Sequence, residues 1–207
     1  MNTTSIRIAA ADEGEELARA ELYGLLARLW LAPPDVELLE QFRVAVTQAP
    51  EGGFLEAPWQ ALVSTLRATT PEAAAAEHEA LFHGVGKPEV FAYGSFYLSG
   101  FLNEKPLAAL RADLSQLGLA RGADALETED HIAYGLEVMR YLIAGDDLAV
   151  CNLEQQRRFF RKHLQTWVEQ LCDTVAAHPR ADTWRAVAAL TRAFVQVETQ
   201  AFDMLEA

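Results

Sequence analysis

The stretch "LETEDHIAYGLEVMRYL", residues 126–142, places titratable side chains directly before a strongly apolar run. A helical wheel at about 100° per residue groups its apolar side chains on one side. This predicted buried stripe consists of Ile132, Leu136, Met139 and Ile143. The opposite side carries Asp130, Tyr134, Glu137 and Tyr141. We therefore predict an amphipathic helix whose outer face is polar and aromatic.

The start of this helix has two interpretations. Thr128 can cap it, and Glu129 and Asp130 favour the positive end of the helix dipole, each by about 1 kcal/mol or less. Capping does not explain His131 at the edge of the stripe, because an imidazolium is disfavoured at a helix N-terminus unless a carboxylate compensates. Asp130 and Glu127 are the candidate compensating groups. The residues alone leave open whether they form a capped helix start or a site.

Helical spacing of apolar residues also dominates outside this stretch, and alternating strand patterns are scarce. In residues 15–31 the stripe comprises Ala18, Leu22, Leu25, Leu26 and Leu29. Further helices are predicted over residues 35–46, with Asp35 as a cap, and over 57–70, 71–82, 96–102, 104–119, 153–175 and 187–201.

Two segments lack such a stripe. Residues 83–95 carry three glycines and one proline, so they are predicted to form an ordered loop. The second segment, residues 118–126, is rich in small residues and is therefore a candidate hinge. We predict an all-α fold in which residues 1–207 form a single-domain bundle of about nine helices.

Composition limits the classes of partner. Acidic residues outnumber basic ones, 30 against 17, so nucleic acid is not an expected partner. The two cysteines are too few for a disulfide framework. No secretory signal pattern and no uninterrupted apolar run of about 18 residues is found. We therefore expect a cytoplasmic protein without stable membrane insertion.

Motifs for common catalytic and metal sites do not fit. "GVGKPE", residues 84–89, has the wrong spacing and a proline for a phosphate-binding loop. His78 and His83 are five residues apart, whereas a helical zinc pair needs a spacing of about four. Cys151 has no adjacent activating base in the sequence. We predict no catalytic residue, no metal site and no cofactor.

Three segments resemble one family. "ETEDHIAYGLEVM" resembles the acidic-x-Asp-His motif and following apolar helix of the TorD/DmsD/NarJ family of redox-enzyme maturation chaperones. Upstream, "EHEALFHGVGKPEVFAYGSFYL" resembles that family's Leu-Phe-x-Gly segment, its loop and its aromatic-x-Ser-x-Tyr continuation. Downstream, "FFRKHLQTWVEQL" resembles its Phe-x-x-His-Leu-x-x-Trp helix. His78 and Glu129 replace an aromatic residue and a proline of the family pattern, which leaves the subgroup and the client open.

The resemblance implies a TorD-like helical fold and a cytoplasmic chaperone, not an enzyme. Its relatives bind the apo form of a molybdenum-cofactor oxidoreductase, often through the twin-arginine leader, and hold it until the cofactor is loaded. Relatives also include domain-swapped dimers, so this chain is expected to be a monomer or such a dimer. The expected client-binding residues are Asp130, His131, Glu127, Tyr134, Glu137, Tyr93, Ser95 and Tyr97.

Two other functions are alternatives to the chaperone. One is a helical scaffold or assembly subunit without leader recognition. The other is an enzyme that uses Asp130 and His131 as an acid–base pair, although no second catalytic group is found. Leu81 and Phe82 match the family's Leu-Phe pair, and we expect them to pack in the core.

Overall fold

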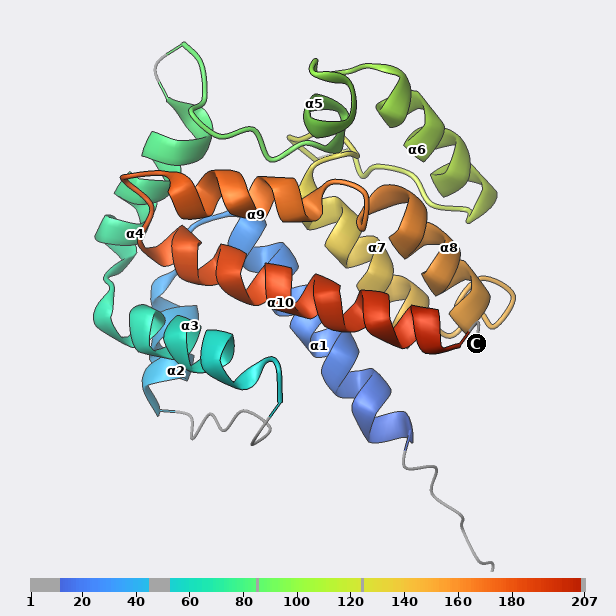
Figure 1. The fold of residues 1–207 in the computed structure, drawn as a ribbon, viewed down its shortest axis with the longest axis horizontal. Helices are drawn as coiled ribbons and strands as arrows, with labels where there is room; N and C mark the ends of the chain where they lie inside the picture. Colours follow the sequence, from blue (N-terminus) through green and yellow to red (C-terminus); the bar gives the residue numbers. More distant parts are fainter. Residues whose placement is uncertain (1–11, 45–52, 85, 124, 206–207) are drawn as a thin grey trace, which may run out of the picture.

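The computed structural model describes residues 12–44, 53–84, 86–123 and 125–205, and within them it contains helices and no sheet (Figure 1). The predicted all-α fold is confirmed. No helix in these ranges is long and apolar enough to cross a membrane. The α-helices are α1 (Asp12–Leu31), α2 (Val36–Val44), α3 (Glu56–Ala68), α4 (Pro71–His78), α5 (Gly94–Ser99), α6 (Lys105–Gln116), α7 (Ile132–Ala144), α8 (Leu153–His163), α9 (Val168–Ala177) and α10 (Thr183–Met204). A π-helical turn, η1 (Glu79–His83), continues α4.

The core is built around α1, α7 and α10, with α1 packed along α7 and α9 beside α10 (Figure 1). Trp30 and Trp184 are fully buried in it. The indole Nε1 of Trp30 donates to Thr191 Oγ1 at 3.0 Å, and that of Trp184 donates to the Leu29 carbonyl at 3.2 Å. Because both donors are satisfied, the rings bury their large apolar surface without an unpaired N–H group.

The expected core packing of the Leu-Phe pair is confirmed. Leu81 is fully buried, and the half-buried Phe82 packs edge-on against Trp30 and Trp184 with ring centroids 5.9 and 5.8 Å apart. These two residues therefore stabilise the fold.

A polar network ties the first helix to the last. Arg19 on α1 donates from Nε and Nη2 to the two carboxylate oxygens of Glu198 on α10, at 2.7 and 2.8 Å. Tyr23 donates its hydroxyl to Glu198 at 2.8 Å, and Arg19 also donates to Gln156 on α8 at 3.0 Å. Bidentate pairing satisfies the nearly fully buried carboxylate of Glu198, which would be costly to bury alone.

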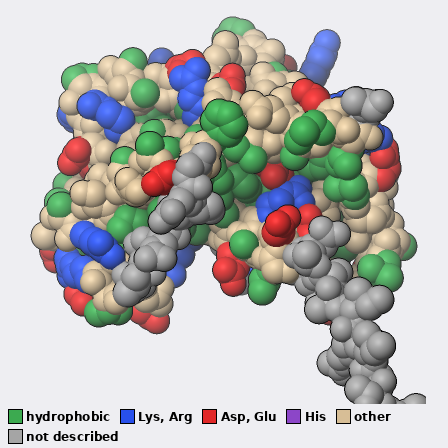
Figure 2. Space-filling model, turned by 60° about the horizontal axis from the view of Figure 1, so that its bottom comes forward, with side chains coloured by type: hydrophobic (Ala, Val, Ile, Leu, Met, Phe, Trp, Pro, Cys, Tyr) green, Lys and Arg blue, Asp and Glu red, His purple; other side chains and the backbone are tan. Residues whose placement is uncertain are grey.

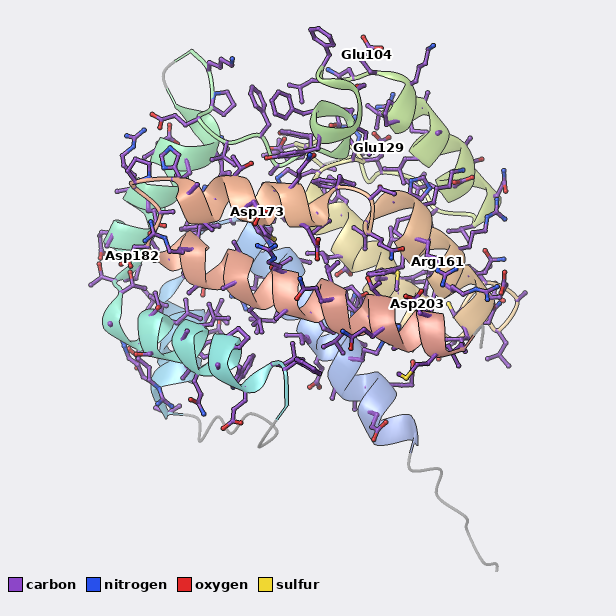
Figure 3. The ribbon with its side chains drawn as sticks, viewed as in Figure 1. Glu104, Glu129, Arg161, Asp173, Asp182 and Asp203 are labelled. Carbon is purple, nitrogen blue, oxygen red and sulfur yellow. The ribbon has the colours of Figure 1, made fainter. Side chains whose placement is uncertain are left out.

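Helix starts follow the capping rules. Asp35 Oδ1 accepts from the Leu38 N–H at 2.8 Å, so the predicted cap of α2 is confirmed. A cap from a distant element was not predicted: Glu77 on α4 accepts the first backbone N–H groups of α10. Its donors are Asp182 at 2.8 Å, Thr183 at 3.0 Å and Trp184 at 2.9 Å. Asp182 lies at the α4 end of α10 (Figure 3).

The prediction of one helix over residues 153–175 is wrong. The structure has two helices there, α8 and α9, separated by a turn. In that turn the Trp167 Nε1 donates to the His163 carbonyl at 2.6 Å, and both Leu164 and Trp167 point into the core. The break accounts for ten α-helices in the described ranges where about nine were predicted.

Candidate functional site

A short backbone pairing brings the two sequence motifs together. Tyr93 and His131 form an isolated antiparallel bridge. The Gly94 N–H donates to the Asp130 carbonyl at 2.8 Å, and the Ile132 N–H donates to the Ala92 carbonyl at 2.9 Å. The residues before α5 therefore lie directly beside the residues before α7, although the two segments are far apart in the sequence.

Asp130 is buried, with 6% of its surface exposed. Its Oδ2 accepts from the Ser95 N–H at 2.9 Å, and its Oδ1 accepts from the Thr128 hydroxyl at 2.6 Å. The expectation of an exposed acid on the outer face of the helix is wrong, because the helix begins only at Ile132. Asp130 instead holds the start of α5 against the turn before α7.

His131, not Thr128, caps α7, which corrects the predicted cap. Its Nδ1 accepts from the Ala133 N–H at 3.3 Å. Burial lowers the pKa of His131 to about 4, and the carboxylates of Glu127 and Asp130 offset this only in part. The imidazole is therefore neutral at pH 7 with its proton on Nε2, so no charged ring needs compensation.

Tyr93 and Glu127 lie on the outer side of this pairing. The Tyr93 hydroxyl donates to the Glu127 carboxylate, and its ring packs edge-on against His131 with centroids 5.1 Å apart. Partial burial and this hydrogen bond raise the pKa of Tyr93 above its usual value. Tyr93 therefore remains a protonated donor at neutral pH.

Ser95 and Tyr97, both on α5, have different surroundings. Ser95 is fully buried beside Asp130, and its hydroxyl has no hydrogen-bond partner among the described residues. Tyr97 stacks on Trp167 with centroids 5.7 Å apart and lines a separate surface pocket with Phe91. The structure thus brings Ser95 to the Asp130–His131 pair but places Tyr97 elsewhere.

Tyr134 and Glu137 line a groove next to the pair. We call it the connector groove; its walls are α6, α7 and residues 119–122 and 125, and its volume is about 280 Å³. Its lining residues are Leu110, Leu114, Leu119, Ala120, Arg121, Gly122, Ala125, Glu129, Tyr134, Glu137, Val138, Tyr141 and Phe159. Most of this surface is apolar.

Two acids on the groove are already in ion pairs. Glu129 accepts from Arg111 Nη2 at 2.8 Å beside α6 (Figure 3), and this pairing lowers the pKa of Glu129. Glu137 accepts from Arg140 Nε at 2.8 Å. Arg140 and Glu137 are both close to half exposed, so theirs is a surface pair of modest strength, whereas the Glu129 side chain is only 14% exposed.

The sequence interpretation missed the apolar wall of the connector groove. Leu119 lies after α6, where the end of a helix over residues 104–119 and a hinge over residues 118–126 were predicted, and Val138 lies on the half-exposed flank of α7. The apolar Leu119 at the end of the predicted helix was the available signal. No signal in the sequence pointed to Phe159 on α8, because its approach to α6 and α7 depends on tertiary packing.

Comparisons with known proteins match the region that contains this site. A family model described as "Nitrate reductase delta subunit" matches residues 53–173, which include the whole site. The chain belongs to the nitrate reductase delta subunit family. The resemblance to the TorD/DmsD/NarJ chaperones is thereby confirmed.

Curated relatives extend the likeness beyond the matched region. The chaperone protein TorD of Aliivibrio fischeri is 28% identical over 200 residues, covering 88% of this chain and 93% of its own. That of Vibrio atlanticus is 29% identical over 203 residues, with the same shares. The chaperone protein TorD of Photobacterium profundum is 25% identical over 188 residues, covering 86% of this chain and 79% of its own.

In this member of the nitrate reductase delta subunit family, the Asp130–His131 pair takes part in hydrogen bonds within the fold. Asp130 accepts two hydrogen bonds, and His131 uses its Nδ1 to cap α7. Within the described residues, no three His, Cys, Asp or Glu side chains are placed to hold a metal ion. The apolar connector groove is an open feature beside these engaged groups.

Proposed function

We propose that this chain is a cytoplasmic chaperone, not an enzyme, for the apo form of a molybdenum-cofactor oxidoreductase. It binds the client's twin-arginine leader and holds the client until the cofactor is inserted. Membership of the family and relatives that are named chaperones support the general role. The observation that carries the leader proposal is the apolar connector groove with acids on its rim.

The apolar segment of the leader occupies the connector groove in this proposal. Several leucine-sized side chains buried at about 2 kcal/mol each give a gross gain near 10 kcal/mol. Ordering the flexible peptide subtracts at least about 2–5 kcal/mol, and association entropy opposes binding further. We therefore expect a dissociation constant of about 1 μM.

The two arginines of the leader lie at the acidic rim. Glu137 pairs with Arg140 at the surface, in a pair worth about 1 kcal/mol or less, whereas the Glu129 side chain is only 14% exposed and interacts with both Arg111 and Arg121. A leader guanidinium can replace Arg140 at little cost. Because charges more than about 8 Å apart are largely screened at physiological salt, this rim steers the peptide and contributes little affinity.

Seven of the eight predicted site residues divide into two roles. We assign direct contact with the leader to Tyr134 and Glu137, which are half-buried in the groove lining, and to the hydrogen-bonded Tyr93 and Glu127, which are half-buried beside the Asp130–His131 pair. Asp130 and Ser95, with the neighbouring His131, are buried and act as positioning residues that fix the segments before α5 and α7. Tyr97 faces another pocket and has no contact with the leader in this proposal.

We also propose that residues 1–207 act as one domain, as a monomer or a domain-swapped dimer, with a hinge at residues 118–126. The described core residues form one cluster from α1 to α10, which supports a single unit. Arg121 donates to the carbonyls of Ala125 and Glu127, each at 3.2 Å, and thereby holds the connector in a closed turn. Removing these bonds with Arg121→Ala should increase the dimer fraction measured by sedimentation if the hinge permits exchange.

Calorimetric titration tests the leader proposal. The probes are synthetic leaders of the organism's molybdenum oxidoreductases, a version with both arginines changed to lysine, and a version with the apolar segment made polar. Each is titrated at low and high salt. We expect the polar version to lose nearly all binding and the lysine version to lose little.

Variants of the chain locate the binding. Val138→Asp places a charge in the connector groove and should abolish binding, whereas Val36→Asp on α2, where the side chain is 62% exposed, is the matched control. Equal binding of all three peptides, or no binding by any leader, would remove leader recognition and leave a chaperone that acts on the mature part of its client.

A further inference from the structure

The first helix is apolar on two sides. Tyr23 and Leu26 are fully buried in the core. Leu22 and Leu25, which belong to the predicted stripe with Leu26, are only half-buried and line an open groove. A helix with apolar residues on both sides is typical of one that packs against neighbours on both sides.

The groove on the second side lies between α1 and α3, over α10. Its apolar lining includes Leu22, Leu25, Leu55, Trp59, Phe194 and Val197, and its volume is about 720 Å³. We call it the α1–α3–α10 groove. Figure 2 shows apolar side chains gathered in a hollow on this face. The Asp130–His131 pair lies near α5, at the opposite end of the molecule (Figure 1).

The charges on this groove are predominantly acidic. Arg19 and Glu198 lie in its lining but neutralise each other through two hydrogen bonds. The other charged lining residues among those described are Glu15 and Glu21, both exposed on α1. They are six residues apart, so they are separated by about 9 Å along the helix axis. An occupant with basic residues flanking its apolar part would complement them.

The walls select a helical occupant. All three walls are helices, and the described residues offer no strand edge with which an extended peptide could pair. An extended segment would bury unpaired backbone groups in an apolar groove, whereas a helix satisfies its own.

We propose that the α1–α3–α10 groove docks an amphipathic helix of a partner protein, with one apolar stripe and lysine or arginine on its flanks. This docking surface is separate from the leader site and does not depend on leader binding. Through this groove the chaperone binds its partner at a second point, on a part of the partner that is already helical.

Fluorescence anisotropy tests the proposal with a defined probe. The probe is a labelled peptide of leucine and lysine, about 18 residues or five turns long, with every leucine on one helix face. A scrambled peptide of the same composition is its control. We expect the amphipathic peptide to bind the full chain at least about tenfold more tightly than the scrambled one.

Charge-matched variants locate the probe. Leu22→Lys and Val197→Lys should each weaken binding of the amphipathic peptide by about tenfold or more, because each places a lysine in the groove. Phe101→Lys adds the same charge at a side chain that is 69% exposed in the turn after α5, and it should leave binding unchanged. Changing both Glu15 and Glu21 to glutamine should weaken binding by a few-fold and reduce its salt dependence.

Several results would overturn the proposal. Equal losses for Leu22→Lys and Phe101→Lys would show attraction by net charge alone. Displacement of the probe by a leader peptide would place it in the connector groove. A tenfold gain on deleting residues 1–11 would make the occupant a segment of this chain, and conversion of a dimer to a monomer by Leu22→Lys would make it a second copy. Leader titration of Leu22→Lys separates this test from that of the leader proposal, because leader affinity should not change.

Discussion

The Asp130–His131 pair and the α1–α3–α10 groove contrast in polarity and in how completely they are filled. At the pair, titratable groups are buried and engaged in hydrogen bonds inside the protein. At the groove, half-buried apolar side chains face open space and the charges lie on the rim. The contrast shows that the motif most conspicuous in the sequence is engaged in hydrogen bonds within the fold, whereas the open apolar surfaces, where we propose that partners bind, carry no motif.

The largest expected effect is the loss of the Asp130 carboxylate. Asp130→Ala leaves the Ser95 N–H unpaired in the interior and removes the bond from Thr128, so it should lower the free energy of unfolding by about 3 kcal/mol. For a chain of this size that corresponds to a fall of about 6–12 °C in melting temperature. Urea unfolding measures the loss, with Asp130→Asn as the control that retains an acceptor. A loss below about 1 kcal/mol would show that Asp130 contributes no more to stability than an exposed acid does. The contrast between the Asp130–His131 pair and the α1–α3–α10 groove would then be weaker.

The pH dependence of stability should be nearly as large. The pKa of His131 is about 4 in the folded protein and about 6.5 in the unfolded chain, so the unfolded state binds the proton more readily. The stabilising difference is fully present above pH 6.5 and is lost as the pH falls to 4. His131→Gln should flatten the curve in this window by up to about 3 kcal/mol. His78, whose pKa burial also lowers to about 4, should retain its own loss in that variant, and identical curves for both proteins would contradict the burial of His131.

Two leucines on α1 compare core and groove within one helix. Leu26→Ala should cost about 3 kcal/mol because the side chain is fully buried, whereas Leu22→Ala should cost about 1 kcal/mol because the groove side is open to water. Chemical unfolding of both variants measures the difference. Equal costs would mean that the groove side of α1 is packed as tightly as its core side.

The smallest effect is expected at the rim of the pair. Tyr93→Phe removes the hydroxyl that donates to Glu127, in a half-buried position, and should cost about 0.5–1 kcal/mol. Leader titration of the same variant gives a second reading, since the freed Glu127 carboxylate should bind a leader arginine slightly more tightly. A cost comparable to that of Asp130→Ala would show that the Tyr93 hydroxyl stabilises the fold as strongly as the buried Asp130 carboxylate does.

Most helices were predictable because their signals are local. The apolar spacing of residues 15–31 and the Asp35 cap each lie within a few turns of one segment, and the structure confirms both. The break between α8 and α9 was not predictable, because the apolar spacing of residues 153–175 continues across it. What breaks the helix is the inward packing of Leu164 and Trp167, which depends on the surrounding core.

The candidate site was predictable in composition but not in exposure. The order of motifs pointed to Tyr93, Ser95, Asp130 and His131, and the structure brings them together. That Asp130 is buried follows from a hydrogen bond with Ser95, 35 residues earlier, which no helical wheel includes. The α1–α3–α10 groove was beyond sequence reasoning for the same reason, since its walls come from both ends of the chain.

The network between Arg19 and Glu198 determines when the protein can complete its fold during synthesis. These residues are 179 positions apart, and at ribosomal rates of roughly 5–20 residues per second the second is made roughly 10–35 seconds after the first. Until α10 has been translated, Arg19 lacks its carboxylate partner and the groove side of α1 lacks α10 beneath it. A nascent chain in this state exposes to water the apolar side chains of α1 that α10 later covers.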